Sequence, residues 1–248
     1  MRYYTIQYSN NLKIIGKYPQ TKSIKYNCHV WDDPRFIEHV HFEKIDFEPI
    51  TANAILQLKS KQTDLINTNS SIGFSKKLLV SEKLKTILLK NRATGLQFFR
   101  APIIQNNLII EDYWILNMYE FNNDYVDISK SKVFYNKKAV DYKLSFNTIK
   151  EQIYFDTFQQ FEQKKIQLWS DNEEIIIIEK INLHAESIKE DFFMIDHIFG
   201  KLFFISERLK QEIEETGCSG IEFQPIELSY NEWTASEGER ERVYGKIK

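Results

Sequence analysis

The stretch Leu79–Lys85 reads LVSEKLK, and after nine further residues Gly95–Phe98 reads GLQF. The same pattern returns 125 residues later, where Phe204–Lys210 reads FISERLK and Gly220–Phe223 reads GIEF, again after nine residues. The two copies align without a gap, and six of the twenty aligned positions are identical. Chance does not explain this agreement, so the sequence predicts two related structural units from an internal duplication.

A serine opens the helix that we expect in each copy. Ser81 and Ser206 each follow an apolar segment, and a serine hydroxyl at an N-cap accepts a hydrogen bond from a free backbone N–H group. Glu82 and Glu207 come next, in the first turn, where a negative charge is favourable beside the positive end of the helix dipole. A capping role is therefore favoured over a nucleophilic one. Asp64, ahead of the first copy, is a candidate cap for a short helical turn of its own.

Apolar residues recur at every fourth position through each predicted helix, which gives the helix one core-facing stripe. The stripe consists of Val80, Leu84 and Leu88 in the first copy and of Ile205, Leu209 and Ile213 in the second. Gly217 is expected to close the second helix in the left-handed conformation, and Asn91 to do the same for the first. Gly95 and Gly220 then begin another strand. Each copy is thus predicted as strand, helix and strand, with a connection long enough to join neighbouring strands by a crossover.

These units indicate an α+β protein with a mixed or antiparallel sheet. The length of 248 residues is compatible with two organisations. Residues 1–140 and 141–230 form two subdomains, which contain the repeat units 77–99 and 202–226 respectively, or the whole chain forms one continuous domain. In both cases the charged segment 231–248 is expected to be a mobile tail.

Three further elements are predicted from local patterns. The alternation in Tyr4–Tyr8, followed by Asn10–Asn11, predicts a β-hairpin. Apolar residues at roughly helical spacing predict a helix over residues 147–165. Leu168–Trp169 and Ile175–Ile178 flank a polar stretch, and this pattern predicts a strand–turn–strand hairpin.

The composition is that of a packed globular protein with little net charge. Hydrophobic residues make up 42% of the chain, and the formal net charge is −2. Such a balance supplies no general basic field for nucleic acid and gives no reason to expect a membrane partner. Cys28 and Cys218 fit neither a zinc motif nor a disulfide framework, and no secretory segment begins the sequence. We therefore expect a cytoplasmic protein with reduced thiols and no cofactor.

Four candidate metal ligands, Cys28, His29, His39 and His41, lie within fourteen residues. On a strand, His39 and His41 would point to the same face. Zinc requires three or four converging ligands, usually with closer pairs of cysteines, so ordinary histidines are favoured. A metal-dependent enzyme that uses His39 and His41 remains an alternative function.

The repeated pattern resembles that of a bacterial immunity-protein family typified by a myxobacterial member, family eleven of the polymorphic-toxin immunity proteins. The further segments that fit this family are Tyr3–Tyr4, Gly16–Pro19, Thr63–Ile66, Trp114–Asn117, Val126–Ser131 and Phe204–Pro225. The resemblance touches most of residues 1–228. Its motifs are short and mostly structural.

The resemblance implies an inhibitor that binds a co-encoded toxin and occludes it, without catalytic residues. The sequence suggests Trp169, Asp171, Glu173 and Glu174 as its contact surface, because tryptophan anchors interfaces and carboxylates attract a basic partner. A polar hairpin tip beside a core tryptophan is the simpler interpretation of the same residues. An adaptor or chaperone is a further alternative, since it would bind a toxin and leave the toxin active.

Overall fold

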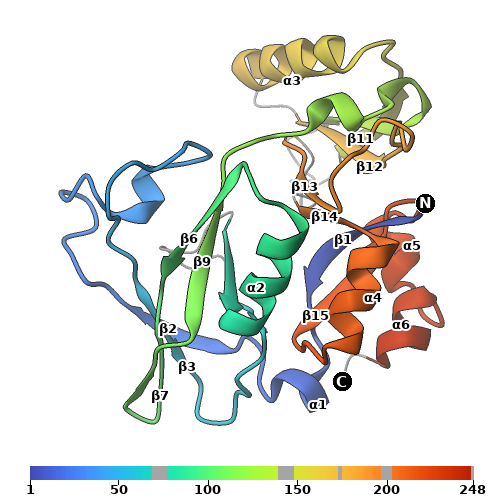
Figure 1. Cartoon of the computed structure of the whole chain (residues 1–248). Helices are drawn as coiled ribbons and strands as arrows, with labels where there is room; N and C mark the ends of the chain where they lie inside the picture. Colours follow the sequence, from blue (N-terminus) through green and yellow to red (C-terminus); the bar gives the residue numbers. More distant parts are fainter. Residues whose placement is uncertain (69–76, 139–147, 173–174, 197–202, 247–248) are drawn as a thin grey trace.

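The computed structural model describes residues 1–68, 77–138, 148–172, 175–196 and 203–246. Within these residues the strands form four sheets, and helices lie between the sheets and outside them (Figure 1). Most strand pairs are antiparallel, and one pair is parallel. The chain is thus an α+β protein, as the sequence predicts.

The first sequence unit belongs to an antiparallel sheet with the strand order β4-β5-β9-β6. Its strands are β4 (Leu65–Ile66), β5 (Leu78–Ser81), β9 (Tyr113–Met118) and β6 (Leu96–Arg100). Helix α2 (Glu82–Asn91) leads from β5 to β6. Both strands pair antiparallel with β9, so they run parallel to each other with one strand between them. The predicted order of strand, helix and strand is confirmed, and the crossover passes over β9 instead of joining neighbouring strands.

The second sequence unit belongs to an antiparallel sheet of the same form, with the order β13-β14-β1-β15. Its strands are β13 (Phe192–Met194), β14 (Phe203–Ser206), β1 (Tyr3–Tyr8) and β15 (Ile221–Pro225), and helix α4 (Glu207–Glu215) leads from β14 to β15. Here β1 occupies the place of β9. The pairing registers agree as well: Ser81 faces Tyr113 in the first sheet, and Ser206 faces Tyr3 in the second.

Two smaller sheets flank this pair. One has the order β2-β3-β7-β8, from β2 (Thr21–Lys25), β3 (Asn53–Leu56), β7 (Ile103–Gln105) and β8 (Leu108–Ile110), with β3 and β7 parallel. The other has the order β11-β10-β12, from β11 (Thr148–Ile153), β10 (Lys132–Lys138) and β12 (Ile175–Lys180). Helix α3 (Phe158–Asn172) packs beside this second small sheet, at the top of Figure 1.

The remaining helices are short. They are α1 (Leu12–Ile15), the 3-10 turns η1 (Ile37–His39), η2 (Asn123–Tyr125) and η3 (Ile128–Lys130), and the C-terminal α5 (Tyr230–Thr234) and α6 (Glu239–Tyr244). The segment expected to be a mobile tail therefore contains helices. Trp233 and Arg240 are both buried there, which fixes the segment to the rest of the protein.

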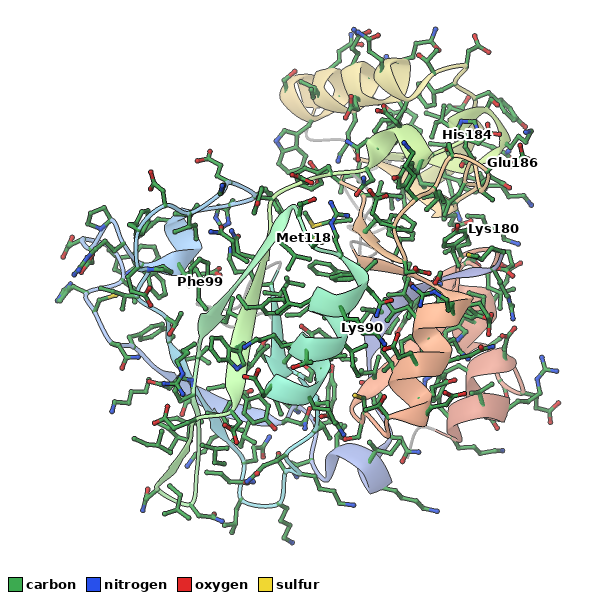
Figure 2. All side chains as sticks on the ribbon, in the orientation of Figure 1. Lys90, Phe99, Met118, Lys180, His184 and Glu186 are labelled. Carbon is green, nitrogen blue, oxygen red and sulfur yellow. The ribbon has the colours of Figure 1, made fainter. Side chains whose placement is uncertain are left out.

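We call the sheets β4-β5-β9-β6 and β13-β14-β1-β15 the repeated sheets. Helices α2 and α4 lie side by side and share one core with both of them (Figure 1). All six residues of the two predicted apolar stripes are buried in this core. At the rim, Lys90 Nζ on α2 lies 2.6 Å from a carboxylate oxygen of Glu212 on α4 (Figure 2). The outer face of each repeated sheet packs against one of the small sheets in a core of its own. The cores thus form successive layers.

The structure corrects two predictions made from local patterns. The residues after β1 form α1 instead of the return strand of a hairpin, and β1 pairs with β14 and β15. The helix predicted over residues 147–165 begins only at Phe158, because the chain forms β11 first. Among the described residues, no helix has the length and apolar character that a membrane span requires.

Candidate functional site

Both serine-capped helices are held by the same kind of side-chain cluster. The hydroxyl of Ser81 accepts a hydrogen bond from a backbone N–H of α2 at 3.2 Å and donates one to Asp64 Oδ1 at 2.7 Å. Ser206 accepts from a backbone N–H of α4 at 3.2 Å and donates to Asp191. The capping role predicted for the two serines is confirmed. Each hydroxyl thus forms hydrogen bonds with a backbone N–H at a helix start and with a carboxylate.

Asp64 connects the two units. Its Oδ2 accepts hydrogen bonds from the backbone N–H and the hydroxyl of Ser219, at 2.8 and 3.2 Å, and lies 3.3 Å from Lys83 Nζ. Lys83 also donates to the backbone oxygen of Gly217, at the end of α4. The sequence suggested that Asp64 caps a helical turn of its own, and this suggestion is wrong. Asp64 instead connects the start of α2 to the end of α4.

Asp191 occupies the corresponding place in the second unit. It pairs with Arg208, which also donates a hydrogen bond to Asn91 at the end of α2 at 2.8 Å. Burial alone would raise the pKa of Asp191, but the hydrogen bonds from Arg208 and Ser206 outweigh it and hold the pKa below its usual value. Both carboxylates thus position helices. Asn91 itself keeps the helical conformation, so its predicted left-handed C-cap is wrong, whereas Gly217 adopts one with φ 70°.

The four candidate metal ligands do not converge in the described part of the chain. His39 ends the turn η1 instead of lying on a strand, and its Nε2 contacts the backbone oxygen of Val30 at 2.7 Å. The ring of His29 pairs with Asp32 at 2.9 Å. Within the described part of the chain, no three His, Cys, Asp or Glu side chains are grouped so that they could hold a metal ion.

The contact residues suggested by the sequence fall on and after α3. Trp169 belongs to this helix and is 61% exposed, and Ile166, one turn earlier, is exposed as well. The predicted hairpin with a core tryptophan is therefore wrong. Asp171 lies in the last turn of α3, and Glu173 and Glu174 lie outside the described residues. The apolar part of the suggested surface faces solvent.

A second exposed surface is formed by the long connection between β2 and β3, residues 26–52, which we call loop 26–52. Its regular structure is limited to the turn η1. Loops of this length without secondary structure of their own are uncommon and usually functional. Its buried residues Phe36, Ile37 and Ile45 belong to the core between the small sheet β2-β3-β7-β8 and the first repeated sheet. The base of the loop is thereby fixed.

Polar side chains from the first repeated sheet hold the same loop. Gln97 on β6 accepts a hydrogen bond from the backbone N–H of Ile45 at 2.8 Å and donates one to its carbonyl oxygen at 2.7 Å. Asn117 on β9 donates to the carbonyl oxygen of Glu43 at 2.9 Å. These bonds fix the backbone at Glu43 and Ile45, so this part of the loop requires little further ordering when it binds a partner.

The outer side of loop 26–52 is aromatic and acidic. Trp31 is 77% exposed, and Tyr26 and Phe47 are exposed too. The loop contains six acidic and two basic residues, a net charge of −4 with neutral histidines, while the rest of the chain carries +2. The histidines of this segment suggest metal ligands in the sequence, and its exposed surface is not predicted from them. The signal available was the concentration of carboxylates around Trp31.

A comparison with models of known protein families gives a match over most of the chain. The model of the immunity protein family (Imm11) matches residues 5–227, which include both repeated units, loop 26–52 and α3. No curated protein matches the sequence significantly. Because the matched segment covers most of the chain, the protein belongs to the Imm11 immunity protein family.

Proposed function

We propose that the protein neutralises a cognate bacterial toxin by binding it stoichiometrically and covering its active site, without catalysis. Family membership supports the immunity role. The observation that carries the mechanism is loop 26–52, which presents Trp31 to solvent directly after Val30, whose backbone oxygen contacts the ring of His39. Tryptophan is enriched among the residues that dominate binding energy in protein interfaces.

The charge of the loop indicates the chemistry of the toxin surface. Asp32, Glu43, Asp46 and Glu48 are exposed around the aromatic residues. Complementary charge speeds association and suppresses wrong partners more than it adds affinity. We therefore expect a basic toxin surface with an apolar pocket that receives Trp31. Binding should slow at high salt, because exposed charges are screened.

We propose that the α3 segment contributes a second contact through Trp169, Asp171, Glu173 and Glu174. The exposed ring of Trp169 beside Ile166 supports this part of the proposal. Loop 26–52 and α3 belong to different layers of the molecule (Figure 1). A toxin that touches both would bury a larger interface than a toxin that touches one of them.

The test uses the toxin encoded beside the immunity gene. We expect a 1:1 complex in which an excess of the protein abolishes toxin activity. Trp31→Ala should raise the Kd about thirtyfold, the loss typical of an interface hot spot, and Trp169→Ala should raise it separately. Tyr230→Ala, which removes an exposed aromatic ring from α5, is the matched control and should leave the Kd unchanged.

Each result has a distinct meaning. A toxin that stays fully active beside an excess of bound protein contradicts neutralisation and favours an adaptor. If neutralisation holds while Trp31→Ala and Trp169→Ala both bind like the unchanged protein, the function stands and both contact surfaces are wrong.

A further inference from the structure

Three segments that are distant in sequence meet at one end of the sheet β2-β3-β7-β8. Strand β3 is antiparallel to β2 and parallel to β7. The start of β2 therefore lies at the same end of the sheet as the ends of β3 and β7. Hydrogen bonds link the segments: Gln57 N donates to Gln20 O at 2.8 Å, and Gln105 Nε2 donates to Ser60 O at 2.7 Å. We call residues 12–22, 57–61 and 106–109 the three-loop end, at the bottom of Figure 1.

Aliphatic side chains project from the three-loop end into solvent. Leu58 is 77% exposed, Leu108 69% and Ile109 60%. Leu12 and Tyr18 are exposed beside them. Leu108 follows directly on the tight turn formed by Asn106 and Asn107, so it stands near the tip of a hairpin. A cluster of exposed aliphatic residues on loop tips is unusual for a surface that contacts only water.

The charges at the three-loop end have one sign. The exposed lysines are Lys13, Lys17, Lys22, Lys59 and Lys61. Residues 9–31, 49–63 and 101–110 contain no aspartate or glutamate. In the part of the chain that the structure describes, no carboxylate forms an ion pair with any of these five lysines. The carboxylate of Glu241, on α6 near α1, pairs with Lys246 at 3.2 Å.

We propose that the three-loop end binds the surface of an anionic lipid bilayer. Leu58, Leu108 and Ile109 enter the headgroup region, and the lysines lie against the lipid phosphates. A protein partner fits less well, because interfaces are depleted in lysine and rely on Trp, Tyr and Arg. Single-stranded nucleic acid would call for several stacking aromatic rings, and the three-loop end offers only Tyr18. The net charge of −2 does not reveal the lysines of the three-loop end, because the negative charge of loop 26–52 offsets their positive charge.

The test is co-sedimentation of the full chain with phosphatidylcholine vesicles that contain or lack phosphatidylglycerol. We expect binding to the anionic vesicles alone, weakened by salt. Lys13→Gln combined with Lys59→Gln should weaken binding about 25-fold, since one lysine near an anionic surface contributes about fivefold. Leu58→Ser combined with Leu108→Ser should weaken it about tenfold or more. All four side chains are exposed, so the variants should unfold at the same urea concentration as the unchanged protein.

Matched controls remove the same groups elsewhere. Lys132→Gln combined with Lys189→Gln, and Ile166→Ser on α3, should bind vesicles like the unchanged protein. The proposal is overturned if anionic vesicles are not bound, or if these controls weaken binding as much as the variants at the three-loop end. It is also overturned if a DNA duplex is bound as tightly and the leucine substitutions have no effect, because that describes a general polyanion site. Toxin neutralisation in solution is independent of all these outcomes.

Discussion

Asp64 accepts hydrogen bonds from residues of both repeated units, so its removal tests their connection. Asp64→Ala leaves the hydroxyl of Ser81 and the backbone N–H of Ser219 without their acceptor, and Lys83 without its counter-ion. Hydrogen bonds to charged groups contribute about 1.5–3 kcal/mol each. Water replaces some of the bonds that the substitution removes, so the total loss is smaller than their sum. We expect the free energy of unfolding to fall by about 3 kcal/mol in urea titration. Asp46→Ala, an exposed carboxylate, is the control and should change it by less than about 0.5 kcal/mol.

Residue roles were predictable where the partner is local. Ser81, Ser206 and Gly217 act on backbone groups within a few residues of themselves, and all three roles are confirmed. The role of Asp64 was not predictable, because its second partner lies 155 residues away. The exposure of Trp169 was missed because it depends on whether its segment is a helix or a strand.

At the scale of elements, the dipeptide Asn-Asn has a different role at two places in the chain. Asn10–Asn11 suggested a hairpin turn, but Asn11 caps α1 with its side chain. Asn106–Asn107 forms the two-residue hairpin turn instead, with both residues in the left-handed region, at φ 52° and 63°. Asparagine suits both roles, so the choice is made by whether the next segment can pair with the preceding strand.

The start of α3 has a signal in the sequence. Thr157 Oγ1 accepts a hydrogen bond from the backbone N–H of Gln160, and the Gln160 side chain accepts one from the backbone N–H of Thr157. This reciprocal pair is a capping box, which Thr and Gln three residues apart predict. The earlier apolar residues Ile149 and Ile153 are four apart, a spacing that fits one face of a strand as well as of a helix. β11 was therefore predicted as helix.

Equivalent positions of the two repeated sheets hold different added segments. Gln97 and Asn117 of the first sheet bind loop 26–52, whereas Glu222 in the second sheet binds Arg240 of α6. In the pairing registers, Gln97 faces Asn117 as Glu222 faces Gln7. One sheet position thus anchors loop 26–52 in one unit and the C-terminal helices in the other.

The ion pair between Glu222 and Arg240 is buried on both sides, and it should decide whether the C-terminal helices dock. Arg240 Nη2 donates to Glu222 Oε1 at 2.7 Å, and both side chains are almost fully buried. Arg240→Met leaves a buried carboxylate without its counter-charge, so we expect a loss of about 3–5 kcal/mol in the free energy of unfolding. Adding Glu222→Gln should recover most of this loss. Arg242→Met, in an exposed position of the same helix, is the control, and an equal loss there would contradict the assignment.

At the scale of the whole molecule, the strand order was beyond prediction. β1 is inserted between β14 and β15, which lie more than 190 residues away in sequence. Its alternating pattern predicts a strand and one buried face, but many strands of the chain offer the same pattern as partners. The net charge was equally uninformative about the candidate sites, because opposite local charges cancel in the sum.

We propose that the agreement of strand order and register between the two repeated sheets reflects the duplication suggested by the sequence. The equivalence extends beyond the repeated stretch, since β1 and β9 are inserted at the same place and in the same register. β1 lies at the start of the chain and β9 lies after the first unit. The chain order of the second unit would then be permuted, with its inserted strand at the N-terminus.

The shared core predicts that the chain unfolds as one continuous domain, the second of the two organisations that the sequence allows. Residues of α2, α4 and both repeated sheets lie in a single cluster, so loosening one unit removes contacts from the other. Two single-tryptophan variants, one retaining Trp114 of β9 and the other Trp233 of α5, should each show the same urea midpoint by fluorescence as by far-UV circular dichroism. Leu84→Ala, a cavity in α2, should lower the free energy of unfolding by about 2–5 kcal/mol at both probes. Two separate transitions, or a shift at Trp114 alone, would instead indicate subdomains that unfold independently.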